Sequence, residues 1–326
     1  MASALVHAWE DFQLHLPWRN HTSVSEFVLQ GFSEYTRAHG FLFCLFLALY
    51  LLALVGNLLI TAVVWANPGL HMPMYIFLVN LALLDMVGSS TAVPTLLEAL
   101  AMGASTISFP ACMTQVFVFS WTLGSELLLF TVMAYDRYVA ICHPLHYSSR
   151  MSPWACGMLV SGIWVVGMLD SILHTAMLAR LSFCGPNTIN HFFCEIPPIL
   201  LLSCSPTQVN ELMTLVTDLS LGGTNFLLTL VSYGCVIASI LRIRSAEGKQ
   251  RAFSTCSAHL IVVSMYYSAV FCAYISPSAS YSPEKAKSIA VLYSLVSPAL
   301  NPLIYTLRNK DVRAALQKLF ARTPAL

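Results

Sequence analysis

Charged residues are scarce in this chain of 326 residues. It holds only 16 Lys and Arg and 15 Asp and Glu, or 10%, whereas a typical soluble domain carries roughly 25%. A soluble protein of this length needs more charge to cover its surface, so the composition argues against a soluble enzyme and against a disordered chain. The net charge of +1 provides no basic field to hold nucleic acid, and we expect no such partner.

Long apolar runs stand in place of the missing charge. Hydrophobic residues make up 57% of the sequence, and a membrane-spanning helix needs about 20 mostly apolar residues. No run alternates with period two, which disfavours an outer-membrane barrel, and lipid cannot satisfy an open backbone. The sequence therefore predicts an all-α membrane protein with seven transmembrane helices. The runs cover residues 41–65, 74–97, 113–136, 155–177, 211–241, 252–276 and 286–307.

An odd number of spans places the two chain ends on opposite sides of the membrane. With the N-terminus outside, most Lys and Arg of the connecting segments fall on the cytoplasmic side, as the positive-inside rule requires. Asn20-His21-Thr22 is a glycosylation acceptor that agrees with this orientation. We expect residues 1–40 to be a mobile extracellular arm without a cleavable signal, 41–307 the bundle, and 308–326 a cytoplasmic tail.

Four of the ten cysteines fall on the predicted outer side. Cys112 opens the third run, and Cys184, Cys194 and Cys204 lie in the loop 178–210. An even number of cysteines on an oxidising face predicts two disulfides, although spacing leaves all three pairings open. Whichever pairing forms, the disulfides would fix the loop over the outer end of the bundle. A metal site at His191, Cys194 and Glu195 is disfavoured, because a cysteine in a disulfide cannot donate a thiolate.

Ionisable side chains inside apolar runs are costly in lipid and are therefore functional candidates. Asp85 and Glu126 lie near the middle of their runs. They either face each other and share a proton or small cation, or are two separate protonated carboxyls. Asp136 and Arg137 end the third run, where a helix-end arginine can also reach the headgroups. For Asp218 in the fifth run, a helix-packing hydrogen bond is favoured over a ligand contact.

Proline and glycine interrupt three of the runs. Pro94 lies in the second, Pro298 and Pro302 lie in the seventh, and Gly222-Gly223 lies in the fifth. Such residues weaken the helical hydrogen-bond ladder and are frequent hinge points.

Several specific motifs occur along the chain in a fixed order and spacing. They are Gly56-Asn57, Leu70-His71-Met72-Pro73-Met74-Tyr75 with Asp85, Met133-Ala134-Tyr135-Asp136-Arg137-Tyr138 through Cys142, Ser232-Tyr233, Arg251-Ala252-Phe253-Ser254-Thr255-Cys256 through Leu260, and Asn301-Pro302-Leu303-Ile304-Tyr305 through Asn309. Taken together, over about residues 26–320, they resemble the olfactory receptors, which are rhodopsin-like G-protein-coupled receptors; the tetrapod-type (class II) branch fits better. Two small departures preserve the chemical character of the position: Arg251 stands where the family usually has Lys, and Ile76 where it often has an aromatic residue.

The resemblance implies specific roles for residues already singled out. Cys112 would pair with Cys194, and Cys184 with Cys204. Asp85 and Glu126, with Asn301 nearby, would form a mid-membrane sodium site, and no other metal or cofactor is expected. Residues 308–320 would form a short amphipathic eighth helix on the inner leaflet. The inner switch that couples to the G protein would comprise Asp136, Arg137, Tyr138, Tyr233, Arg251, His259 and Tyr305.

The resemblance also implies an odorant pocket in the outer third of the bundle, between helices three, five and six. On helix three the spacing of the candidates predicts a single inward stripe, and this pocket would suit a small, mostly apolar volatile. The candidates are Phe119, Ser120, Leu123, Gly124 and Leu127 on helix three, Asp218 on helix five, and Tyr267, Val270, Phe271 and Tyr274 on helix six.

The function implied is an odorant receptor in the plasma membrane that activates a stimulatory heterotrimeric G protein and raises cyclic AMP. No nucleophile with a base, phosphate loop or metal cluster points to an enzyme. One alternative is an ion or proton transporter or channel that uses Asp85 and Glu126, although we find no repeat symmetry between the halves. Another is a receptor of the same fold that senses an internal metabolite outside the nose.

Overall fold

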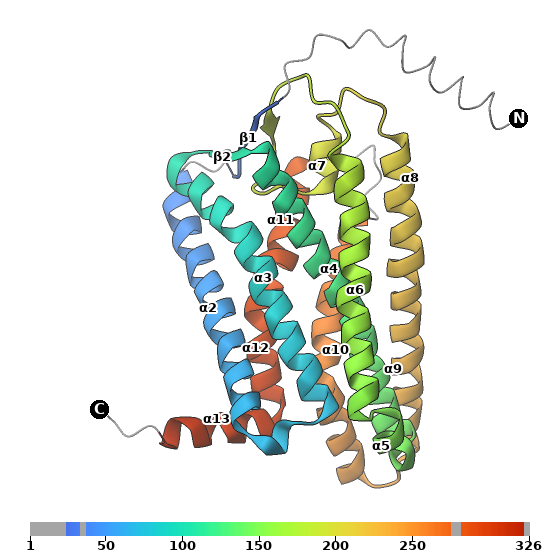
Figure 1. Ribbon diagram of the computed structural model, residues 1–326. Coiled ribbons are helices and arrows are strands. Elements are labelled where there is room, and N and C mark those ends of the chain that lie inside the picture. The colour runs from blue at the N-terminus through green and yellow to red at the C-terminus, as the bar shows by residue number, and fades with distance from the viewer. Residues whose placement is uncertain (1–23, 33–36, 275–281, 323–326) are drawn as a thin grey trace, which may run out of the picture.

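The computed structural model describes residues 24–32, 37–274 and 282–322. It is a bundle of long helices that run side by side (Figure 1). Each predicted apolar run is found in a helix or a closely spaced helical series. The runs correspond to α2 (His39–Ala66), α3 (Pro73–Met102), α4 (Phe109–Cys142), α6 (Pro153–Leu178), α8 with η4 and α9 (Gln208–Arg242), α10 (Ala246–Tyr274), and α11 with η6 and α12 (Pro283–Arg308).

Within the described ranges, six helices are long and apolar enough to cross a membrane. These are α2, α3, α4, α6, the series from Gln208 to Arg242, and the series from Pro283 to Thr306. The chain is therefore a helical, multi-pass membrane protein. The sixth run lies in α10, which packs against α4, α9 and α12.

Local sequence explains where several helices begin and end. Pro73 opens α3, and Pro153 opens α6 directly after Ser152, whose hydroxyl accepts the Ala155 N–H at 3.3 Å. A proline in the first turn loses no helical hydrogen bond, and serine satisfies a free N–H group. At its other end α3 stops at Gly103, whose φ of 88° suits only glycine without strain.

Two of the predicted interruptions coincide with π-helical turns. η4 (Asp218–Gly223) joins α8 (Gln208–Thr217) to α9 (Thr224–Arg242) and ends on the glycine pair. η6 (Leu292–Val296) joins α11 (Pro283–Val291) to α12 (Ser297–Arg308) just before Pro298. By contrast, Pro94 lies within α3 without ending it.

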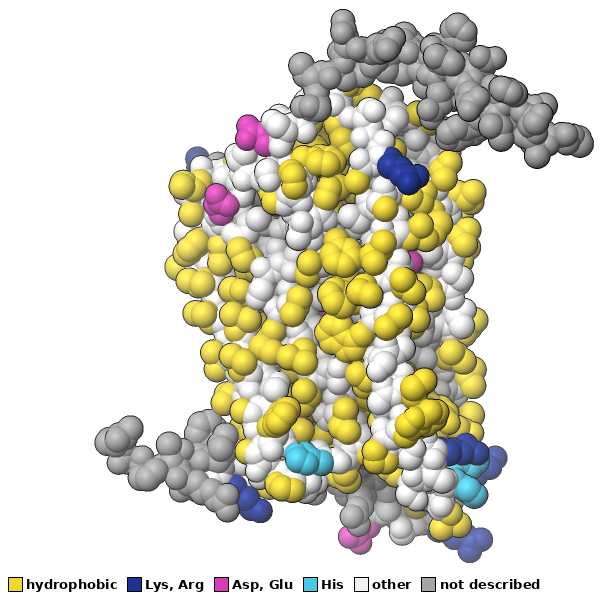
Figure 2. Space-filling view, viewed as in Figure 1, with side chains coloured by type: hydrophobic (Ala, Val, Ile, Leu, Met, Phe, Trp, Pro, Cys, Tyr) yellow, Lys and Arg dark blue, Asp and Glu magenta, His cyan; other side chains and the backbone are white. Residues whose placement is uncertain are grey.

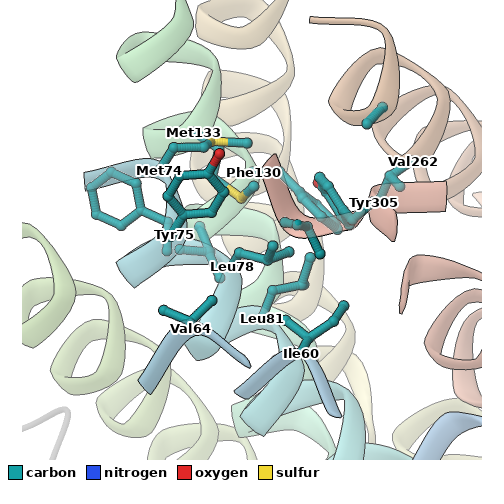
Figure 3. Close-up of a cluster of buried hydrophobic side chains, with 14 of the residues drawn as sticks. Ile60, Val64, Met74, Tyr75, Leu78, Leu81, Phe130, Met133, Val262 and Tyr305 are labelled. Carbon is teal, nitrogen blue, oxygen red and sulfur yellow. The ribbon is translucent and has the colours of Figure 1, made fainter. Parts of the chain in front are cut away.

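The largest buried cluster fills one half of the bundle. Figure 3 shows side chains from α2, α3, α4, α10 and α12 converging on one another. Tyr305 of α12 and Phe130 of α4 are at most 1% exposed. Because so many helices contribute to one cluster, a shift of any of them must be accommodated by the others. The labelled members are Ile60, Val64, Met74, Tyr75, Leu78, Leu81, Phe130, Met133, Val262 and Tyr305.

A three-stranded sheet caps the opposite end of the bundle (Figure 1). The central strand, β1 (Glu26–Leu29), pairs antiparallel with β2 (Ser105–Ser108) and parallel with β3 (Thr188–Ile189). Phe27 and Leu29 of β1 are fully buried. The expectation of a mobile arm over residues 1–40 is therefore wrong for this segment, because its main chain is hydrogen-bonded on both edges.

The end of the bundle opposite the sheet carries short helices between the long ones. These are η2 (Pro68–Leu70), η3 (Pro144–His146) and α5 (Tyr147–Arg150), followed after α12 by α13 (Lys310–Arg322). Figure 2 shows hydrophobic side chains covering the middle of the visible face, with most of its Lys and Arg at this end. Such a band between two polar ends suits a protein surrounded by lipid.

Candidate functional site

The end of α4 carries a buried ion pair. Arg137 donates from Nε to Asp136 Oδ2 at 2.9 Å, and a second guanidinium nitrogen bonds the same oxygen. Asp136 is fully buried and Arg137 is 8% exposed. Tyr147 of α5 donates to the other carboxylate oxygen, Oδ1, at 2.8 Å. Burial and the nearby Asp136 raise the pKa of Tyr147, so its hydroxyl stays protonated and able to donate.

The other predicted switch residues lie near this pair without bonding to it. Tyr138 bonds to His143 Nε2 at 2.9 Å. Tyr233 of α9 bonds to Nδ1 of His259 on α10, a link across two helices that the sequence did not indicate. Tyr305 is buried, and its hydroxyl has no hydrogen-bond partner within the described part of the chain. The side chain of Arg251 lies outside the described residues.

A second polar group lies in the middle of the bundle. Asn301 of α12 donates to both carboxylate oxygens of Asp85 on α3, at 3.1 and 2.9 Å. Glu126 of α4 is 7% exposed and close enough to interact with the charge of Asp85. The structure thus brings Asp85, Glu126 and Asn301 together. Asn57 of α2 links the same region to α12 by donating to the Pro298 carbonyl at 3.0 Å.

The small cavity beside Glu126 lies between α3, α4 and the helical series η6 and α12. About 10 Å³ is accessible to the centre of a water molecule, which is enough room for one water. Phe119 and Leu123 of the predicted stripe on helix three line it, and Tyr293 and Ser294 line it from η6. The cavity lies on the side of α4 that faces η6 and α12. The odorant pocket predicted from the sequence lies instead between helices three, five and six.

The remaining pocket candidates are spread over different surfaces. A Cβ at Gly124 would lie 4.0 Å from Gly167 Cα, so Gly124 faces α6 and the five-residue stripe is not one inward face. Ser120 is half-buried, and Leu127 packs against the largest buried cluster. Tyr267 contacts the ring of Phe226 on α9, with centroids 5.0 Å apart.

Asp218 is half-buried at the first residue of η4. Three further pocket candidates belong to α10, but their side chains lie outside the described residues: Val270, Phe271 and Tyr274.

Two disulfides stabilise the cap, by which we mean the end of the bundle that carries the three-stranded sheet. Cys112 at the start of α4 is bonded to Cys194, and Cys184 is bonded to Cys204. Both predicted pairings are confirmed. Because Cys194 is committed to a disulfide, it cannot serve as a metal ligand, and within the described residues no group of three or more His, Cys, Asp or Glu could hold a metal ion. Asn20 lies outside the described residues.

The loop between these cysteines contains a buried histidine. His191 is fully buried, its Nδ1 bonds to the Phe193 carbonyl at 3.2 Å, and its Nε2 lies 3.6 Å from Glu195 Oε1. Burial lowers the pKa of His191, and Lys287 lowers it further, whereas Glu195 and the Phe193 carbonyl partly offset this. The imidazole is therefore held neutral at physiological pH.

Sequence reasoning missed one polar group, which lies in the half of the bundle nearer the sheet. His174 of α6 lies 3.5 Å from Asp170 Oδ1 through Nδ1, and its Nε2 is 3.1 Å from the Thr217 hydroxyl of α8. The spacing of Asp170 and His174, four residues apart in an apolar run, was the available signal. Thr217 could not be found this way, because it comes from another helix.

Comparisons with known proteins agree with this architecture. The family profile described as "Olfactory receptor" matches residues 43–323. The chain is 56% identical to olfactory receptor 13A1 of Homo sapiens over 301 residues, which is 92% of each chain. It is 49% identical to olfactory receptor 13G1 of Homo sapiens over 93% of this chain and 98% of that protein. Olfactory receptor 1M1 of Mus musculus is 44% identical over 93% of this chain and 97% of its own.

These matches decide between the receptor and the transporter considered from the sequence. They extend over nearly the whole chain and across all the motifs that carried the resemblance. The transporter alternative has no comparable support. The chain therefore belongs to the olfactory receptor family: it is an odorant receptor and not an enzyme.

Proposed function

We propose that this odorant receptor crosses the plasma membrane seven times, with its N-terminus outside and its C-terminus in the cytoplasm. Six candidate spans together with α10 supply the seven crossings. The sheet and both disulfides occupy the end opposite α13, and disulfides belong on the oxidising side of a membrane. Glycosylation at Asn20 is part of the same proposal.

α13 would lie on the inner leaflet as an amphipathic eighth helix. Val312 and Ala315 are buried against the bundle, whereas Arg313 and Lys318 are exposed. A helix with one apolar face and one basic face suits the boundary between acyl chains and anionic headgroups.

An allosteric sodium ion would bind beside Asp85. Two observations support it: Asp85 and Glu126 are buried close together, and Asn301 Oδ1 is buried without a hydrogen-bond donor in the described part of the chain. A hard cation accepts carboxylate and amide oxygens as ligands. Replacing external sodium by a large organic cation should then change agonist potency in the wild type but not in D85N.

The odorant would bind in the outer half of the bundle and favour an arrangement that is open on the cytoplasmic side. Only a difference in affinity between the two arrangements can shift the population. Opening would break the Asp136–Arg137 pair and free Arg137 for a stimulatory G protein, which then raises cyclic AMP. The observation that carries this proposal is the buried ion pair, held closed by Tyr147.

The test is a screen of volatile odorants with a cyclic AMP readout, repeated on R137A and the matched control R150A. Arg150 is also basic and cytoplasmic but is exposed. We expect R137A to abolish the response at equal surface expression, while R150A retains it. An undiminished response of R137A would disprove the role given to this residue.

A further inference from the structure

The side chains of Glu195 and Tyr293 are joined across the outer end of the bundle. The Tyr293 hydroxyl, from η6, donates to Glu195 Oε2 at 2.7 Å. The other oxygen, Oε1, faces His191 Nε2 at 3.6 Å. The Glu195 side chain is 18% exposed while His191 is completely buried. The carboxylate therefore sits at the boundary between outer solvent and the interior.

This pair lies over the small cavity described above. Tyr293 is one of its lining residues, and the Phe119 ring below lies 5.9 Å from the Tyr293 ring and 4.6 Å from the Phe193 ring. Glu126 lines the same cavity two helical turns further along α4, about 10 Å from Phe119. The cavity thus has the Tyr293 phenol at its outer end, hydrogen-bonded to the Glu195 carboxylate just beyond the lining, and the Glu126 carboxyl at its inner end, with apolar and hydroxyl side chains between them.

We propose that Glu195 and Tyr293 form the polar end of the odorant site and select small neutral molecules that carry a hydroxyl group. The inference rests on the odorant-binding function proposed above and specifies its ligand class. An alcohol inserted between the two side chains donates to the Glu195 carboxylate and accepts from the Tyr293 hydroxyl, so both partners stay satisfied. An aldehyde can only accept, which leaves Glu195 without the donor that Tyr293 now supplies.

Charge repulsion should exclude odorants that carry a carboxylate group. A carboxylate odorant would meet Glu195 at the outer end and Glu126 at the inner end, and like charges repel strongly away from water. Lys287, a positive charge that acts on the neighbouring His191, is buried, packs over the Phe32 ring at 5.9 Å and is not among the cavity-lining residues. Recognition of acids by Lys287 is therefore the competing outcome of the test.

The small cavity must widen at its outer end before an odorant can enter it. The cavity has room for about one water, and on the side where α3 meets α4 a Cβ at Gly88 would already lie 3.1 Å from Thr122 Oγ1. Tyr293, however, belongs to the π-helical turn Leu292–Val296, where the regular helical ladder is interrupted. Movement of Tyr293 away from Glu195 would open the cavity and free both hydrogen-bonding groups together.

The experiment uses the full-length receptor in cells with a cyclic AMP readout and surface labelling. The probes are four straight-chain compounds of equal length: octanol, octanal, octanoic acid and octane. We expect the alcohol to be at least about ten-fold more potent than the acid. E195Q should lower alcohol potency by about 10- to 100-fold and Y293F by about 5-fold, because hydrogen bonds to a charged group contribute more than neutral ones.

Two matched variants control for general effects of these substitutions. E211Q alters an outer carboxylate that is bonded only to the nearby Thr207 among the described contacts, and Y50F alters a tyrosine that donates to Ser90 on the α2–α3 surface. Both should respond like the wild type. E195R, in receptors that reach the surface, should gain a response to the acid.

Three results would overturn the assignment: acid potency equal to or above alcohol potency, E195Q behaving like E211Q together with Y293F behaving like Y50F, or no response to any of the four probes while other odorants raise cyclic AMP. The last result leaves the receptor function intact. By contrast, failure of every odorant in the wider screen counts against the proposed function itself.

Discussion

The hydroxyl of Tyr147 donates to Asp136 Oδ1 at 2.8 Å, so the carboxylate that holds Arg137 is itself held by α5. Asp136 and Arg137 are neighbours in sequence and could pair in any orientation of α4. Tyr147 adds a constraint from the connection between α4 and α6, because it fixes which way the carboxylate points. The resting arrangement therefore depends on the loop as well as on the helix.

Replacing Tyr147 with phenylalanine should raise basal activity. The change removes one hydrogen bond to a buried carboxylate, and a loss of about 1 kcal/mol shifts the population of the open arrangement roughly 5-fold. Cyclic AMP measured without odorant, normalised to surface receptor, tests this. Y135F is the matched control, because Tyr135 is 37% exposed. Equal basal cyclic AMP in Y147F and Y135F would show that the loop contact does not restrain the pair.

Phe27 should contribute strongly to the stability of the end of the bundle that carries the sheet. Its ring is fully buried against Phe109 and Phe183, with centroids 6.1 and 5.6 Å away. Truncating a buried phenylalanine to alanine typically costs about 3–5 kcal/mol. F27A should therefore lower the melting temperature of the purified receptor and its surface level. F41A, which truncates a ring that is 72% exposed, should do neither. Similar losses in both variants would mean that β1 is not an integral strand.

The helices could be predicted from the sequence, whereas the sheet could not. Length and hydropathy are local properties, and each predicted run falls within helical structure. β1 has only four residues, and its partners β2 and β3 lie far along the chain. Its pairing depends on how the loops come together, which no local pattern records.

The same distinction holds for the candidate site. Asp136 and Arg137 are adjacent, so their pairing could be anticipated, and the two disulfide pairings followed from the family resemblance but not from spacing. The bond between Glu195 and Tyr293 joins residues 98 positions apart. Gly124 followed the predicted stripe in spacing, yet it faces α6 because a helix turns about 100° at each residue.

Breaking either disulfide should destabilise the cap by an amount that follows loop length. Cys184 and Cys204 are 20 residues apart and Cys112 and Cys194 are 82 apart. Loop-closure entropy predicts about 3 kcal/mol for a loop near 15 residues and about 4.7 kcal/mol near 100. C112S should therefore reduce surface expression more than C184S. The double variant C184S/C204S should match either single variant, and a clearly additive loss would contradict the pairing.

His191 should make the receptor less stable in acid. Burial lowers its pKa in the folded state, so the unfolded chain binds a proton more readily than the folded chain does. The stability that comes from the neutral imidazole is present above the ordinary histidine pKa, about 6.5, and is lost as the pH falls below it. Each unit of lowering corresponds to about 1.4 kcal/mol.

The measurement is the melting temperature of the purified receptor between pH 7.5 and pH 5. The wild type should lose more stability on acidification than H191Q, because glutamine does not titrate. H39Q is the matched control: His39 also bonds to a main-chain carbonyl, that of Phe32 at 3.0 Å, but it is only half-buried. If H191Q and the wild type melt in parallel across this range, burial of the imidazole does not set the acid sensitivity of the cap.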